Sequence, residues 1–266
     1  MAIFKGKNLK GSFGNITFSR QGDSHIIKSK ITNIKQTAAT KKTASVFGRY
    51  ISPFAKLIRR SFDEVVNGYA DGSMVNRMNS AVSMLIYQYI DEDGNFHFQE
   101  NSFNRLRDFN FNLSSPLDKT LLVKPLITFT TGMVEIKWPE FRLAKNLRFP
   151  PNATRCRIHF CCTRFCLAQA KWDVRDMEEI MIQKSQLTTV EQIFQYPMPE
   201  GCLFLLAMGI SYSGANLKST LNSKRFHPAG IVDVHYLPGT PQAAEIDKWM
   251  PLPFAMPMAT PSSDNA

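Results

Sequence analysis

Acidic residues are almost missing from the first quarter of this 266-residue sequence. Residues 1–60 hold 13 lysines and arginines against one aspartate, Asp23, whereas residues 61–266 hold 19 basic and 21 acidic side chains. The overall net charge of +10 therefore comes from the N-terminal segment and not from the chain as a whole. A segment of this kind is typical of a surface that meets a polyanion or an acidic protein.

Long apolar runs are also absent. No stretch reaches 18 uninterrupted apolar residues, so the sequence predicts no membrane span. Lysine and glycine interrupt the first residues, which argues against a signal peptide; we expect synthesis in the cytoplasm and leave the final location open. Four of the five cysteines lie between Cys156 and Cys166, which favours reduced thiols over a disulfide framework.

Motifs for the common catalytic chemistries are missing as well. The sequence contains no glycine-rich or Walker phosphate loop and no Gly-x-Ser-x-Gly elbow. Asp233 and His235 are two residues apart on an expected strand, but no nucleophile accompanies them, so a surface cross-strand pair is the simpler interpretation. We therefore expect a protein without enzymatic activity, catalytic residues or a cofactor.

Two segments resemble metal sites without completing them. Cys156-x-x-His159 precedes three more cysteines, but strand alternation separates Cys156 and Cys162 from His159 and Cys161, as in a buried strand. Asp91-x-Asp93-Gly94 resembles the start of a calcium loop, yet glycine at position six and glutamate at position twelve are missing, which favours a helix-terminating turn. No metal site is predicted.

Hydrophobic periodicity predicts an α+β fold that is mainly β. Residues 1–45 form a basic arm, with a β-hairpin over 11–30 and a polar connector over 31–45. Residues 46–95 carry two apolar stripes at helical spacing and predict an antiparallel helical hairpin, in which Ser52-Pro53 is a kink or an N-terminal turn. Residues 96–236 change to a two-residue period. This change predicts an antiparallel, immunoglobulin-like β-sandwich.

Proline dominates the remaining segment, residues 237–266, which holds six prolines. Proline excludes a helix and an interior strand, so this tail is expected to be an extended arm. Its apolar side chains predict that it lies in an apolar groove, either of its own chain or of a neighbouring copy.

The N-terminal region resembles an uncharacterised family of Bacteroidota proteins, a domain of unknown function with a glycine-rich hairpin and a sandwich-like C-terminal region. The resemblance covers residues 1–236 loosely and supports the fold more than any function. It rests on Lys5-Gly6, Gly11-x-x-Gly14-Asn15, Ile26-Ile27-Lys28-x-Lys30, Phe47, Ser52-Pro53, Phe62, Gly132, Ile136-x-Trp138 and Ser211-Tyr212-Ser213.

These features lead to a preferred hypothesis and an alternative. We expect a structural protein that self-assembles into a filament, tube or similar polymer through both arms. The expected assembly residues are Phe13, Ile16, Phe18, Ile26, Ile27, Trp249, Leu252, Phe254 and Met256.

The alternative is a nucleic-acid or polyanion-binding protein, or a capsid-like one. In either case the basic residues face the partner, which for assembly is an acidic patch around Asp173, Asp176, Glu178 and Glu179 of the next copy. The basic residues concerned are Lys28, Lys30, Lys35, Lys41, Lys42, Arg49, Lys56, Arg59 and Arg60.

Overall fold

The computed structural model describes residues 2–5, 8–21, 24–30, 37–174, 177–214 and 220–259. Contacts between Cα atoms divide the chain into two compact units, Met1–Ser45 and Val46–Ala266. We call the first the N-terminal unit and the second the body, and each is described by itself.

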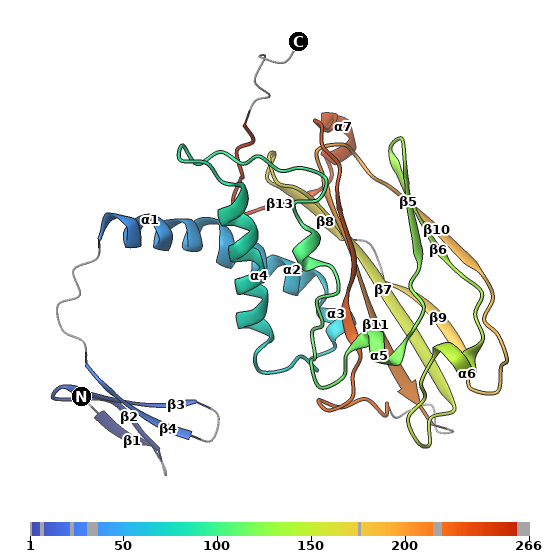
Figure 1. The fold of residues 1–266 in the computed structure, drawn as a ribbon, viewed down its shortest axis with the longest axis horizontal. Coiled ribbons are helices and arrows are strands. Elements are labelled where there is room, and N and C mark those ends of the chain that lie inside the picture. Colours follow the sequence, from blue (N-terminus) through green and yellow to red (C-terminus); the bar gives the residue numbers. More distant parts are fainter. Residues whose placement is uncertain are drawn as a thin grey trace. The chain divides into compact units, whose positions relative to one another are not determined.

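The N-terminal unit is a four-stranded antiparallel sheet in which consecutive strands are neighbours (Figure 1). Its strands are β1 (Ala2–Lys5), β2 (Asn8–Phe13), β3 (Ile16–Gln21) and β4 (Ser24–Ser29). The predicted hairpin over residues 11–30 lacks one turn: a turn at Gly14-Asn15 divides its first half into β2 and β3, and Gly14 adopts a positive φ of 55°. The predicted polar connector is helical in its last part, where alanine and lysine begin α1 (Ala38–Val46).

The first apolar stripe is helical as predicted, and Ser52-Pro53 does not end the helix. After α1 the chain makes a π-helical turn, η1 (Phe47–Ile51), and continues as α2 (Ser52–Ser61) and α3 (Asp63–Val66). The Ser52 N–H donates to the Phe47 carbonyl five residues earlier. Proline cannot donate in the next turn, so the wider π turn carries the helix past it.

The second stripe forms α4 (Met74–Tyr89), whose Met78, Val82, Leu85 and Ile86 are buried. The two helices do not form the predicted antiparallel hairpin, since α4 crosses α2 instead of running alongside it (Figure 1). The apolar stripes of both helices pack on the large sheet as well as on each other. Packing on this common sheet favours the crossed arrangement of the two helices.

Two antiparallel sheets complete the body. The smaller has the order β10-β6-β5, and the larger has β12-β11-β7-β8-β13 with β9 also paired to β7. The strands are β5 (Leu126–Thr130), β6 (Met133–Trp138), β7 (Arg155–Cys166), β8 (Lys171–Val174), β9 (Glu178–Gln183), β10 (Gln192–Pro197), β11 (Leu203–Ser213), β12 (Ala229–Tyr236) and β13 (Met250–Pro251). Four short helices accompany these strands: η2 (Asn104–Leu106) and α5 (Leu117–Thr120) precede β5, α6 (Leu143–Asn146) follows β6, and α7 (Ala243–Ile246) follows β12.

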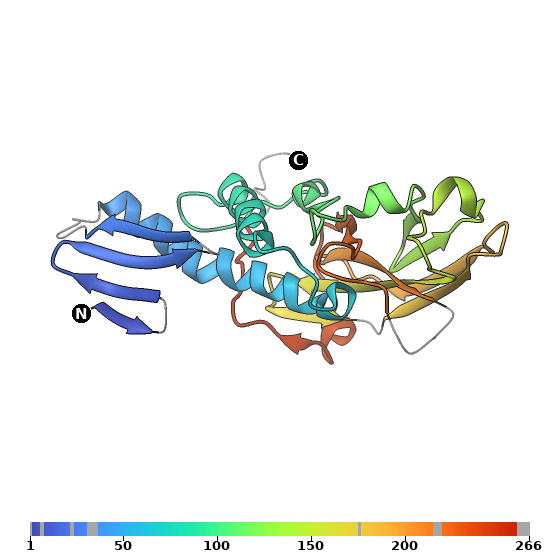
Figure 2. The same ribbon diagram turned by 90° about the horizontal axis from the view of Figure 1, so that it is seen from below.

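The larger sheet is buried on both faces. On β11, Leu203 and Leu205 pack with α2 and α4, whereas Phe204 and Leu206 pack toward the smaller sheet. The body therefore has three layers, helices, large sheet and small sheet (Figures 1 and 2), where the sequence predicted a sandwich beside a separate helical pair. The α+β class with mainly antiparallel strands is confirmed, and the immunoglobulin-like topology stays a prediction.

Candidate assembly surface

The N-terminal sheet carries its apolar side chains on one face. Phe13 lies opposite Ile16, and Phe18 lies opposite Ile27, so these four predicted assembly residues share that face with Leu9. Phe13 is 77 % exposed, Ile27 65 % and Ile16 43 %, while Phe18 and Leu9 are partly buried. No side chain described in β1–β4 is buried, so this sheet has an apolar face and no core.

The opposite face of the same sheet is mainly polar. Ser12 lies opposite Thr17, with 3.0 Å between their hydroxyl oxygens, and Thr17 lies opposite Lys28. Lys10 belongs to this face by alternation, and so does Ile26, which places this expected assembly residue away from the other four. Of the described positions, those bearing lysine all avoid the apolar face.

The predicted basic surface is divided between the two units. Lys28, Lys30, Lys41 and Lys42 are exposed in the N-terminal unit, and Lys35 lies outside the described residues. In the body, Arg49, Lys56 and Arg60 are exposed, whereas Arg59 is partly buried and donates to the Asn79 side-chain oxygen at 3.3 Å.

The predicted C-terminal assembly residues lie in the core of their own chain. Trp249, Leu252 and Phe254 are 7–8 % exposed and Met256 is fully buried. Backbone hydrogen bonds from Leu252 to the Ala170 carbonyl, at 2.7 Å, and from Met256 to the Leu167 carbonyl, at 2.9 Å, hold the segment. Residues 250–258 are extended as predicted, but the prediction that the tail contains no helix is wrong, because Ala243–Ile246, which lie between Pro241 and Pro251, form a short helix. The groove that the segment fills is that of its own chain.

The expected acidic patch is already occupied by partners within the chain. Asp173 pairs with Arg164, a buried guanidinium that also lies 4.8 Å from the Trp249 ring. Acidic residues on β9 are engaged as well: one accepts a hydrogen bond from a tyrosine hydroxyl, and the next pairs with an arginine. These contacts are Tyr196–Glu178 at 3.1 Å and Arg157–Glu179 at 3.3 Å, and Asp176 lies outside the described residues.

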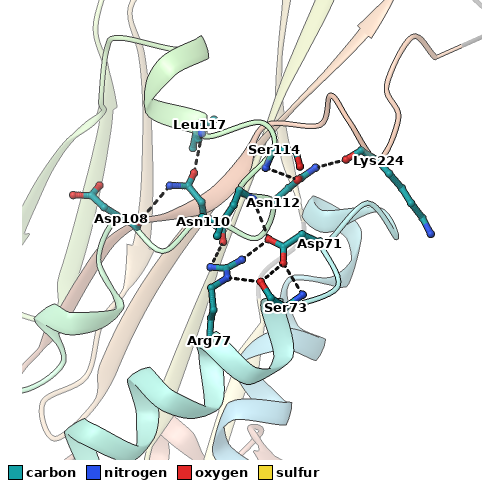
Figure 3. A network of polar contacts seen from close by, with 10 residues as sticks. Asp71, Ser73, Arg77, Asp108, Asn110, Asn112, Ser114, Leu117 and Lys224 are labelled. Carbon is teal, nitrogen blue, oxygen red and sulfur yellow. Dashed lines mark hydrogen bonds and ion pairs between the residues drawn. The ribbon is translucent and has the colours of Figure 1, made fainter. Parts of the chain in front are cut away.

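A polar network joins the start of α4 to the segment that follows η2 (Figure 3). The Asp71 carboxylate accepts hydrogen bonds from the backbone and hydroxyl of Ser73, from the Leu113 N–H and from Arg77 at 2.6 Å. Burial raises the pKa of Asp71, but these hydrogen bonds outweigh it and lower the pKa to about 2. A carboxylate held so firmly in its charged form is a poor proton acceptor, so this network joins elements rather than performing chemistry.

Beside this network lies a cavity of about 220 Å³. Leu117, Leu121 and Met208 form part of its apolar lining, and an Asp108–Lys124 ion pair of 2.5 Å is among its polar groups. The cavity offers space for a small molecule, but the described side chains bring no nucleophile and base together there.

A larger cavity of about 410 Å³ lies against β7, β9 and β11. There Glu179 accepts from Arg157 and lies 3.4 Å from the His159 ring nitrogen. Burial lowers the pKa of His159, and the interaction with Glu179 acts against that shift. Ser211 also lines this cavity, yet no hydrogen bond in the described part of the chain joins it to His159, so a nucleophile–base pair is not formed.

The cysteines lie on a buried strand and Asp91 lies in a turn, as expected from the sequence. Cys156 and Cys162 face the small sheet and Cys161 faces the helices, and all three are buried. Asp91 accepts from the Asn95 N–H at 2.8 Å and contacts a histidine ring nitrogen at 2.9 Å, which closes the turn after α4.

Asp233 and His235 do not form the expected cross-strand pair. Asp233 pairs with Arg107 at 2.8 Å, whereas the His235 ring stacks on Phe129 with 4.0 Å between ring centroids.

Across the described ranges, no helix is both long and apolar enough to cross a membrane.

Comparison of the chain with protein-family models, with curated proteins and with solved structures finds no significant match. The resemblance to a Bacteroidota family therefore stays a prediction, and the function has to be argued from the residues themselves.

Proposed function

We propose that this chain is a non-enzymatic structural protein that self-assembles into a filament, tube or similar polymer, with the N-terminal sheet as the contact. One observation supports this proposal above the others: the sheet exposes Phe13, Ile16 and Ile27 on one face and buries none of its described side chains. A single sheet layer gains stability only when its apolar face is covered.

The occupant that we propose is the body of a second copy. The distribution of lysine supports it, since the described lysines of the sheet lie on its other face and would stay in water when the apolar face is covered; of the described basic residues of the sheet, Arg20 shares the apolar face with Phe18. The C-terminal segment offers no free apolar arm, because its side chains are buried in their own chain. The proposed assembly therefore uses the N-terminal sheet and not the C-terminal segment.

The edge of the small sheet offers a receiving surface on the body. Leu187, Val190 and Ile193 are 86 %, 75 % and 52 % exposed, and β10 is an edge strand whose described pairing is with β6 alone. Residues 187–197 contain one glutamate and no lysine or arginine, so they do not repel a basic sheet. A contact between two different surfaces of identical chains is heterologous, and such contacts grow into polymers when the rotation does not close.

The test compares substitutions on the two faces of the N-terminal sheet. In nuclease-treated full-length protein, Phe13→Thr combined with Ile27→Thr should abolish polymers seen by negative-stain microscopy and sedimentation. Ile26→Thr on the opposite face should leave them intact, since threonine keeps the β-propensity. A wild-type monomer at all concentrations would overturn the proposal, and so would a closed dimer.

A second candidate function has one observation in its favour. Lys10 and Lys28 share the polar face of the sheet with Ser12 and Thr17, an arrangement that suits phosphate contacts. Binding to nucleic acid would then weaken with salt as counterions are released. Filter binding without any salt dependence would exclude this candidate, whereas polymer formation in the absence of nucleic acid favours assembly.

A further inference from the structure

Two of the five cysteines lie side by side in the interior of the body. The β7–β11 ladder pairs Phe165 with Leu203, and the next position of this antiparallel register sets Cys166 opposite Cys202. Both thiols are fully buried in the cluster between the two sheets. Directly opposite residues of antiparallel strands approach the separation that a disulfide spans.

The local backbone stabilises negative charge on one of these sulfurs. Immediately after β7 the chain turns at residues 167–170, so the backbone N–H groups of Ala168 and Gln169 come near the Cys166 sulfur. The neighbouring Cys202 thiol has the largest influence on the pKa of Cys166; together with these N–H groups it outweighs burial and lowers that pKa. The pKa of Cys202 is raised, first by the neighbouring Cys166 and then by burial.

The other cysteines of β7 provide the contrast. Cys156 is buried on the same face, but burial raises the pKa of its thiol to about 12. Cys161 faces the opposite, helical side of the sheet. Cys166 therefore differs from Cys156 in the direction of its pKa shift and from Cys161 in the face of the sheet that it occupies.

We propose that Cys166 and Cys202 are a redox-active dithiol that forms an intrachain, cross-strand disulfide when it meets a peroxide. The Cys166 thiolate attacks one peroxide oxygen and the O–O bond breaks, giving a sulfenic acid and a hydroxide that takes up a proton as water. The Cys202 sulfur then attacks the sulfenic sulfur; the S–S bond forms, and the hydroxyl group leaves with the Cys202 proton as a second water. Both thiols are oxidised, and one peroxide is reduced to two waters.

The experiment uses the native full-length protein and hydrogen peroxide. After graded exposure, the chain is denatured, alkylated and mapped under non-reducing conditions. Two of the five thiols should escape alkylation, with a Cys166–Cys202 linked peptide that disappears on reduction. Cys166→Ser and Cys202→Ser should each abolish the link, whereas Cys156→Ser, a buried cysteine on the same strand face, should retain it.

The result that overturns the proposal is equally specific. Loss of all five thiols at similar rates, or a sulfinic acid at Cys166 without the linked peptide, would show that the pair does not act together. The wild-type peptide map alone decides this if a serine variant fails to fold. The result of the peptide map is independent of polymer formation, so a negative result would not contradict the proposed function.

Discussion

The N-terminal sheet and the large sheet of the body use the same alternation of side chains but differ in what covers them. In the large sheet, Leu205 faces the helices and Phe204 faces the small sheet, and both are fully buried. In the N-terminal sheet, Phe13 and Ile27 share a face that stays mostly exposed. Alternation thus selects which side chains lie together, and a covering layer decides whether they stabilise the chain.

The largest effect that this comparison predicts comes from removing the C-terminal segment. Deleting residues 249–266 removes four buried side chains, each worth about 2–5 kcal/mol in large-to-small substitutions. This loss is of the order of the whole stability of a typical domain, about 5–15 kcal/mol. We therefore expect the truncated body to be unfolded by circular dichroism and chemical denaturation.

The matched control is a deletion at the other end. Removing residues 1–30 takes away a sheet in which none of the described side chains is buried, and the free energy of unfolding of the body should stay within about 0.5 kcal/mol of wild type. A body that remains fully stable without residues 249–266 would instead assign that segment to a neighbouring copy.

A smaller effect on the stability of the body distinguishes Phe54 from Phe13. Phe54 is fully buried, and its ring lies 5.5 Å from Phe165 and 6.1 Å from Phe254 between ring centroids. Phe54→Ala should lower the free energy of unfolding of the body by about 3–5 kcal/mol in urea denaturation. Phe13→Ala should change it by less than about 0.5 kcal/mol but impair assembly. Equal losses of stability would contradict the division into two units.

The smallest effect is a dependence on pH in the body. His227 is buried, and its ring nitrogens lie 2.9 Å from the Val65 carbonyl and 2.8 Å from the Asn222 amide. Burial lowers the pKa of His227, so the unfolded chain binds a proton more readily than the folded one. Stability is therefore fully present above the ordinary histidine pKa, about 6.5, and falls as the pH drops below it.

Urea denaturation at pH 7.5 and 5.5 measures this dependence. Wild type should lose stability at the lower pH, and His227→Gln should lose less between the two values even if it starts lower. Burial also lowers the pKa values of His159 and His235, so a reduced slope is expected, not a flat one. A slope that is identical in the variant and in wild type would contradict this role of His227.

Part of the fold could be predicted because local patterns specify it. The apolar stripe with Phe54 and Ile58 predicts a buried helix face, and alternation along β7 predicts which cysteines share a face. Strands β8 and β10 have only a weak local signal, since β8 has four residues and β10 ends in a proline-rich stretch that resembles a loop. The three-layer arrangement has no local signal, because it depends on which face each helix covers.

The candidate sites, like the fold, could be predicted from the sequence only in part. Alternation already places Ile26 and Ile27 on opposite faces of β4, but only the turn between β2 and β3 sets Phe13 opposite Ile16, which is an odd number of residues away. The pairing of Cys166 with Cys202 joins residues 36 positions apart, and only the β7–β11 ladder brings them together. A short period in a sequence cannot specify such non-local contacts.

The sequence by itself determined the two long apolar helix stripes, most strands of the body, the basic character of the N-terminal unit and the extended form of residues 250–258, because each depends on neighbouring residues and on backbone chemistry. Only the tertiary structure decided that the segment with Leu252 and Met256 completes its own core, whereas the apolar face with Phe13 does not. The physical reason is that burial is a property of two surfaces in contact, and a sequence describes each surface without its partner.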